Sequence, residues 1–391
     1  YRKIVAGYPD DLDAQLQLGE TLFHFNPLRG RSIVEAQTAF DQMLKFDGAN
    51  AAALDHEVDI AQVSGQARLI PTYAARYARL AGGETMDALP IRWADAWARN
   101  DKAAREALFP ELERAAAEHW YSLQHTVVRA LWQSDDLGDA MRLATMASGS
   151  PDADQQAEAL DLQATIDLAL GRPDAAREKL DAAARIAPKR KTVLYRQFWP
   201  STLDFLPRER RLLRRDLEGV RKIADPDWRT PYIAGAIAIR LDDNAAAQAA
   251  ISELEEAVAD GSGARDAARA LRARLAHSRH DDAAAMTALE EQELEIPFSK
   301  LQYYYRLGEP YLRIELNPFE GERLQNSFDF YDTHAAIWFA PIARLRARQL
   351  ESVDREAARR QYERYLQLRQ DPEPSLAPEV AEARRRLQLL Q

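Results

Sequence analysis

Residues 157–188 read AEALDLQATIDLALGRPDAAREKLDAAARIAP, and this stretch decides the fold. Alanine-rich and leucine-rich segments flank Gly171, and Pro188 closes the stretch, which predicts a helix, a turn and a second helix. Four side chains have the spacing of a packed helical hairpin: Ala164, Ala176, Leu180 and Ala183. Small side chains let two helices cross closely, and the bulkier leucine fills the groove between them.

The same spacing recurs along the chain with more drift. Three further segments keep it: Gly235, Ala247, Ile251 and Leu254; Ala273, Ala285 and Leu289; and Ala358, Tyr362 and Tyr365. Further helix pairs are expected at residues 50–80, 85–117, 118–148 and 190–224. We find no apolar–polar alternation of the kind that paired strands show. A period of about 35–40 residues predicts an all-α array of helical repeats, with residues 378–391 as a charged capping helix.

The spacing within residues 157–188 resembles the tetratricopeptide repeat (TPR), which has small residues at its positions 8, 20 and 27. The segment YYYRLGEPY, residues 303–311, also resembles the first helix of this repeat. The resemblance implies a right-handed α-solenoid of about ten TPR-like hairpins. It implies one superhelical domain over residues 1–391, with a possible boundary near residues 190–226.

Both ends of the chain resemble one group of TPR arrays more closely. These ends are LGETLFHFNPLRGRSIVEAQTAFDQMLKFD, residues 18–47, and FAPIARLRARQLESVDREAARRQYERYLQL, residues 339–368. They resemble the repeat regions that follow serine/threonine kinase or transcriptional-activator domains in large bacterial signalling proteins. Since the chain begins at Tyr1 within an expected helix, we expect it to be a fragment of a longer polypeptide.

The turn of the first hairpin carries two arginines, Arg29 and Arg31. Gly19 and Ala36 lie 17 residues apart where the standard repeat needs 12, so five residues are inserted at this turn. A phosphate-binding loop would need a lysine and a preceding strand, and neither is present. The two arginines are therefore candidates for contact with a partner at an exposed turn.

The resemblance also implies a concave groove, lined by the first helix of each pair. Groove positions of the TPR pattern fall on six residues here: Arg229, Tyr232, Arg240, Tyr305, Glu309 and Arg313. Aromatic and arginine side chains on a concave surface suit an extended peptide or a terminal carboxylate.

Composition excludes several classes of function. A net charge of −10 argues against a nucleic-acid binder, and the absence of cysteine excludes disulfides, thiol nucleophiles and Cys-ligated zinc. No apolar run is long enough to span a bilayer. We expect no metal site: residues 277–282, HSRHDD, suit a solvated turn, and His56, Glu57 and Asp59 do not form a His-Glu-x-x-His motif.

No catalytic constellation, cofactor motif or targeting signal is visible, so we expect a non-catalytic scaffold that binds a protein or peptide. In a bacterial signalling protein it would be the sensor or regulatory part. Two alternatives stay open: an adaptor subunit of an enzyme or assembly complex, and a small-molecule sensor in the groove. The compartment, cytoplasmic or extracytoplasmic, and the oligomeric state stay open as well.

Overall fold

The structure, a computed structural model, describes residues 1–27, 31–81, 85–133, 137–257, 262–290, 308–320 and 333–390. Within these ranges the chain is helical and contains no strand, which confirms the predicted all-α class. The chain divides into two compact units. The first comprises Tyr1–Ile166 with Gln325–Ala336, and the second comprises Asp167–Leu324 with Ile337–Gln391.

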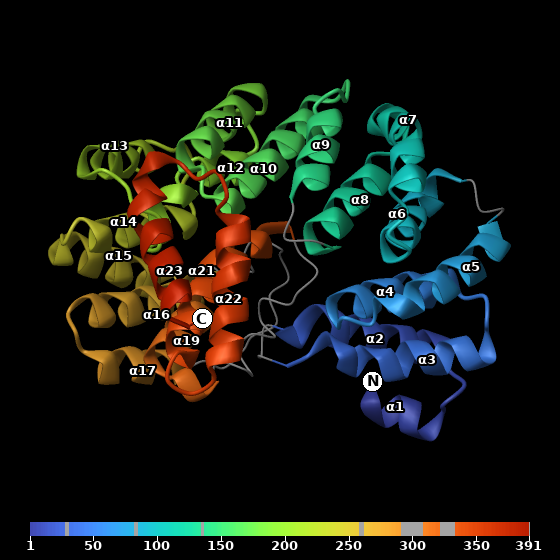
Figure 1. Ribbon diagram of the computed structural model, residues 1–391. Coiled ribbons are helices and arrows are strands. Elements are labelled where there is room, and N and C mark those ends of the chain that lie inside the picture. The colour runs from blue at the N-terminus through green and yellow to red at the C-terminus, as the bar shows by residue number, and fades with distance from the viewer. Residues whose placement is uncertain are drawn as a thin grey trace. The chain divides into compact units, whose positions relative to one another are not determined.

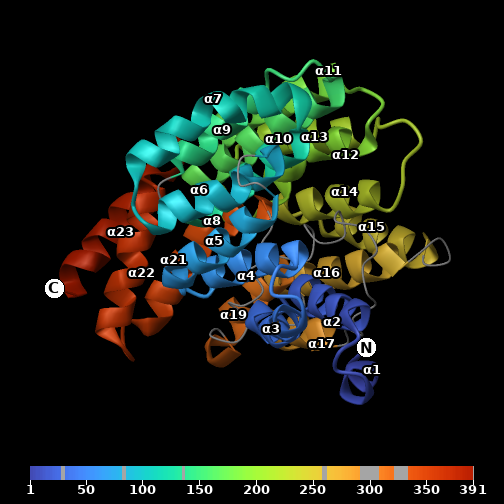
Figure 2. The same ribbon diagram turned by 90° about the vertical axis from the view of Figure 1, so that its right-hand side faces the viewer.

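The first unit is a succession of helices, and from α1 to α9 each packs against the next (Figures 1 and 2). They are α1 (Arg2–Gly7), α2 (Leu12–Phe25), α3 (Gln37–Phe46), α4 (Ala51–Val63), α5 (Ile70–Ala81), α6 (Leu89–Ala98), α7 (Lys102–Glu118), α8 (Trp120–Gln133), α9 (Gly138–Ala147) and most of α10 (Ala153–Leu170). Short polar side chains begin several of these helices. Asp11, Asn50 and Asp101 each accept a hydrogen bond from the main-chain N–H three residues ahead, as N-caps do.

A polar network lies inside the first unit, where α4 packs against α8. Arg129 on α8 is fully buried, and its guanidinium donates to Asp59 Oδ1 at 2.9 Å and to Asp55 Oδ1 at 2.8 Å. Gln62 donates to the Arg129 carbonyl at 2.9 Å, and Trp93 donates to Gln133 at 2.8 Å. The network ties α4, α6 and α8 together through polar groups as well as apolar ones.

The second unit begins with the end of α10 and continues through eleven described helices. They are α11 (Pro173–Ile186), α12 (Lys191–Arg196), α13 (Arg210–Val220), α14 (Arg229–Arg240), α15 (Asn244–Glu256), α16 (Ser262–Ser278), α17 (Asp282–Glu290), α19 (Gly308–Leu316), α21 (Phe339–Leu350), α22 (Arg355–Leu368) and α23 (Ala377–Leu390). Its core is centred on α14, where every residue from Pro231 to Ile239 is buried. None of the helices in the described ranges combines the length and apolar character that a membrane span requires.

Close helix crossings occur where the sequence has glycine. A Cβ atom at Gly235 of α14 would lie 2.5 Å from Leu271 Cδ1 and 2.9 Å from Ala250 Cβ. A Cβ at Gly19 of α2 would lie 2.6 Å from the Phe40 ring. Since real Cβ atoms essentially never approach so closely, only glycine permits these crossings.

The segment after α22 packs back onto the turn between α10 and α11, and we call this contact the latch. Gly171 has φ +80°, and its carbonyl accepts a hydrogen bond from Glu373 N at 3.0 Å. The Glu373 carboxylate in turn accepts from the N–H groups of Asp174 and Ala175 at the start of α11. The buried Arg369 donates to the Ala169 carbonyl, 200 residues earlier in the chain. The turn between α10 and α11 is therefore joined to the segment that connects α22 to α23.

Helical hairpins occur at most of the predicted positions. The pairs α4–α5, α6–α7, α8–α9 and α10–α11 match the segments expected near residues 50–80, 85–117, 118–148 and 157–188. Residues 190–224 are irregular, because α12 has one and a half turns and a 3-10 helix at Trp199–Thr202 follows it. Pro200 and Pro207 fall in this stretch, and proline cannot donate the main-chain hydrogen bond that a continued helix needs.

Candidate functional site

A cavity of about 450 Å³ lies within the second unit, inside the size range of small-ligand and peptide-anchor pockets. Its wall combines aromatic and aliphatic side chains with four arginines and three carboxylates. The lining residues that carry the argument are Trp199, Asp204, Phe205, Tyr232, Arg240, Arg274, Tyr311, Glu315, Trp338, Arg344, Arg348 and Glu379.

Helices from distant parts of the sequence supply this wall. Tyr232 and Arg240 come from α14, and Arg274 comes from α16, which packs on α14 beside Gly235. The irregular stretch 199–206 supplies Trp199 and Phe205, while α19, α21 and α23 close the other sides. The departure from regular helix near residue 200 thus puts aromatic side chains into the cavity.

Three aromatic rings in the wall contact one another. The Phe205 ring lies 4.9 Å from Trp338 and 6.0 Å from Tyr311, centroid to centroid, and Tyr311 lies 5.3 Å from Trp338. Inclined rings at these separations attract each other beyond simple burial. Burial and the nearby Glu315 carboxylate raise the pKa of Tyr311 above its usual range, so its hydroxyl stays protonated at neutral pH.

Arg240 is a largely buried cation whose hydrogen bonds go to main-chain carbonyls. It donates to Ser201 at 3.1 Å and to Leu206, without an ion pair to any carboxylate in the described ranges. Burial lowers the pKa of Arg240 to about 10, partly offset by Asp204, so the guanidinium is still charged at neutral pH. Asp204 is itself engaged, because Arg274 donates to its Oδ1 at 2.7 Å. This end of the cavity holds two arginines and one carboxylate.

A second pair of arginines, on α21, also lines the cavity. Arg344 donates to Glu379 of α23 at 2.5 Å. Arg348 lies one turn further along α21, is exposed, and makes no hydrogen bond or ion pair with any described residue. An exposed guanidinium in the cavity wall can bind an incoming carboxylate through two parallel N–H···O hydrogen bonds.

The six predicted groove residues do not share one site. Tyr232 and Arg240 both line the cavity. Arg229 does not: it pairs with Asp227, and its guanidinium lies 4.7 Å from the centre of the Tyr195 ring. Arg313 is on α19 but is absent from the cavity wall, and Tyr305 and the Glu309 side chain lie outside the described residues.

Of the two arginines predicted to contact a partner at the turn of the first hairpin, the structure describes only Arg31. Arg31 donates through Nε to Glu35 Oε1 at 2.9 Å, four residues further on, while Arg29 lies outside the described residues. The Ser32 hydroxyl accepts from Val34 N at 3.2 Å and begins a 3-10 helix, Ile33–Ala36. Arg31 is thus engaged within its own turn.

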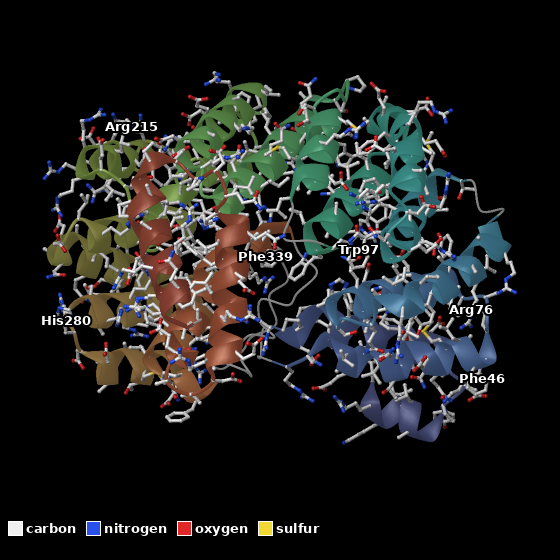
Figure 3. The ribbon with its side chains drawn as sticks, in the orientation of Figure 1. Phe46, Arg76, Trp97, Arg215, His280 and Phe339 are labelled. Atoms are coloured by element: carbon white, nitrogen blue, oxygen red, sulfur yellow. The ribbon has the colours of Figure 1, made fainter. Side chains whose placement is uncertain are left out.

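In the predicted polar turn at residues 277–282, His277 and Ser278 line the cavity. The turn at residues 277–282 connects α16 and α17, and His280 lies at its tip with φ +61° (Figure 3). The arginine-rich helix α13 buries Leu213, Leu217 and Val220 and exposes Arg215 (Figure 3). Its one buried carboxylate, Asp216, accepts hydrogen bonds from Arg177 and Ser201.

Most of the cavity wall was missed by sequence reasoning. Phe205, Arg274, Tyr311, Arg344 and Arg348 come from four segments whose approach depends on the tertiary packing of the second unit. A weak signal existed in the stretch FWPSTLDFL, residues 198–206, where aromatic residues and a proline interrupt a helical pattern. Comparison of the chain with models of known protein families and with characterised proteins found no match. The functional argument therefore depends on the residues themselves.

Proposed function

We propose that the chain is a non-catalytic, TPR-like binding scaffold, and that the cavity of the second unit holds the carboxylate-bearing end of a peptide segment from a partner protein. The observation that supports this most is Arg240, a largely buried guanidinium at the cavity wall without a carboxylate partner among the described residues. A buried cation is stabilised when an anion reaches it, since the two charges then interact outside bulk water. The proposed α-solenoid of TPR hairpins is the architecture that would present such a site.

Arg348 and the aromatic rings of the wall offer further contacts to such a ligand. Arg348 offers guanidinium donors at the exposed side of the cavity, while Phe205, Tyr311 and Trp338 offer an apolar face. A peptide end that joins a carboxylate to an apolar or aromatic side chain would meet both features. We assign this capture to the regulatory or sensor part of a bacterial signalling protein, as the sequence resemblance implies.

The cavity volume also fits a second candidate, a small-molecule sensor for an aromatic or aliphatic carboxylate. A volume of about 450 Å³ holds a metabolite-sized ligand as readily as one anchoring residue of a peptide. The two functions differ in whether chain beyond the carboxylate-bearing residue contributes to affinity.

Peptide pools test the proposal directly. Two pools of N-terminally labelled octapeptides of equal composition, each with an apolar last residue, would end in a free carboxylate or in a carboxamide. We expect fluorescence anisotropy to show binding of the carboxylate pool alone. Arg348→Gln should weaken that binding about 10- to 100-fold, since hydrogen bonds to charged groups contribute about 1.5–3 kcal/mol.

Arg211→Gln is the matched control, because Arg211 on α13 is 79% exposed and lies outside the cavity. This variant should bind the carboxylate pool as the wild type does. Equal binding of both pools, or unchanged binding by Arg348→Gln, would contradict the proposal. Thermal stabilisation by small free carboxylates, with no binding of either pool, would favour the sensor instead.

A further inference from the structure

Two histidines and one glutamate converge on the surface of the first unit, far in sequence from the residues of the cavity. Glu20 and His24 lie one turn apart on α2, and His56 comes from the neighbouring helix α4. His24 Nε2 is 3.1 Å from Glu20 Oε2, and His56 Nε2 is 3.2 Å from Glu20 Oε1. One ligand atom from each residue lies within 4.8 Å of the other two. We call this group the His–Glu–His cluster.

A main-chain contact orients the His56 ring. Its Nδ1 lies 2.9 Å from the Ala52 carbonyl oxygen, which can only accept, so Nδ1 carries the proton. In the neutral ring, Nε2 then holds the lone pair and faces Glu20. Metal-binding histidines are commonly oriented in this way, with the second ring nitrogen donating to a carbonyl.

Aromatic side chains hold the same ring from two sides. The Phe40 ring stacks on His56 with centroids 4.5 Å apart, and the Phe23 ring meets it edge to face at 5.0 Å. Phe23 and Phe40 are both buried, so His56 is fixed in the α2–α3–α4 packing and is only 15% exposed. His24 is 46% exposed and borders the solvent. The cluster is thus rigid on one side and accessible on the other.

The spacing of the ligand atoms fits a tetrahedral zinc ion. Nitrogen and oxygen ligands lie about 2.0–2.2 Å from Zn²⁺, which places neighbouring ligand atoms about 3.4 Å apart in a tetrahedron. Each imidazole Nε2 lies within 0.3 Å of that distance from one oxygen of the Glu20 carboxylate, Oε2 for His24 and Oε1 for His56. Two imidazoles and one carboxylate form a known zinc-binding donor set that leaves one coordination position open.

We propose that Glu20, His24 and His56 form a binding site for a divalent transition metal, with Zn²⁺ as the best fit. The proposal concerns the first unit and goes beyond the peptide-binding function assigned to the second. His24 Nε2, His56 Nε2 and one Glu20 oxygen are the protein ligands, and the exposed fourth position takes water or a donor from a partner. Imidazole with a single carboxylate favours zinc over the oxygen-seeking ions Mg²⁺ and Ca²⁺.

Cobalt substitution tests the site on the full chain, expressed without a histidine tag and stripped with chelator. We expect Co²⁺ to bind in one equivalent with the intense visible absorption of tetrahedral coordination, and Zn²⁺ to remove that absorption by displacement. His24→Ala and His56→Ala should each weaken binding by more than roughly 100-fold, the upper end of what loss of an outer hydrogen-bond partner costs.

The control is a histidine–carboxylate pair that forms no three-ligand group with the other described residues. His277 Nδ1 lies 2.9 Å from Asp282, so His277→Ala removes a similar pair and should leave Co²⁺ binding unchanged. Because His24 is half exposed, His24→Ala should keep the circular dichroism of the wild type even if His56→Ala does not fold. Binding by His24→Ala as tight as that of the wild type, or a six-coordinate spectrum, would overturn the proposal.

Discussion

Replacing Arg129 with methionine should lower the free energy of unfolding of the first unit by about 3–5 kcal/mol, the typical cost of removing one partner from a buried ion pair. Methionine matches much of the arginine stem in length but leaves Asp59, which is buried, without its closest cation. Urea unfolding followed by hydrogen exchange in α4 and α8 would measure the loss in this unit separately from the second one.

This loss should depend on pH in a defined direction. Burial raises the pKa of Asp59 to about 6, although Arg129 acts against the rise, and removing Arg129 raises it further. The folded state then binds more protons than the unfolded chain, whose aspartate titrates near 3.8, so stability falls as the pH rises above that value. The deficit of Arg129→Met relative to the wild type should therefore be largest at neutral pH and smaller near pH 5.

Two further variants test whether the loss of stability comes from breaking the buried ion pair rather than from removing any arginine. Arg99→Met removes an arginine that is 54% exposed and pairs with Asp95 one turn earlier, and should cost no more than about 0.5 kcal/mol. Adding Asp59→Asn to Arg129→Met should recover part of the loss, since it removes the stranded charge. A loss below about 1 kcal/mol for Arg129→Met, or a deficit that grows at low pH, would contradict this account.

Gly171→Ala should destabilise the second unit by about 2–5 kcal/mol, because two costs add. The φ of +80° costs an L-residue about 1–2 kcal/mol, and overpacking costs about 1–3 kcal/mol more. The new Cβ would lie 2.8 Å from both Arg369 Cδ and Leu376 Cδ1, so the latch would have to shift. Hydrogen exchange of α11 and α23 would report the change, and both helices should lose protection together.

Gly65→Ala separates the two costs. Gly65 follows α4 with φ +71°, and a Cβ there would meet no atom within 4 Å, so only the conformational cost of about 1–2 kcal/mol should appear. Equal losses for the two alanine variants would show that the close approach of Arg369 and Leu376 adds no overpacking cost to Gly171→Ala.

Local signals predicted the helices well, because they depend on residues close together in sequence. The spacing of Ala164, Ala176, Leu180 and Ala183 depends on one helical period, and all four side chains are buried as expected. Gly235 was placed correctly at a close crossing by the same logic. The irregular stretch near Pro200 departed from the repeat, since one helical period cannot describe a segment that proline interrupts.

Neither the cavity wall nor the His–Glu–His cluster could be found in this way. Arg240 and Arg348 lie more than a hundred residues apart in the sequence and line the same cavity only because of tertiary packing. The cluster had one local signal, the spacing of Glu20 and His24 by one helical turn. In the sequence, the third member, His56, was compared only with the His-Glu-x-x-His motif, whose two histidines lie on one helix.

The latch has a consequence for how the protein is made. The ribosome adds about 5–20 residues per second, and Arg369 follows Ala169 by 200 residues. The Gly171 carbonyl and the first N–H groups of α11 are therefore synthesised roughly 10–40 s before Glu373, their hydrogen-bond partner. Until then the nascent second unit can form its successive hairpins but cannot close. Chaperones and proteases thus meet an open intermediate that the finished protein does not present.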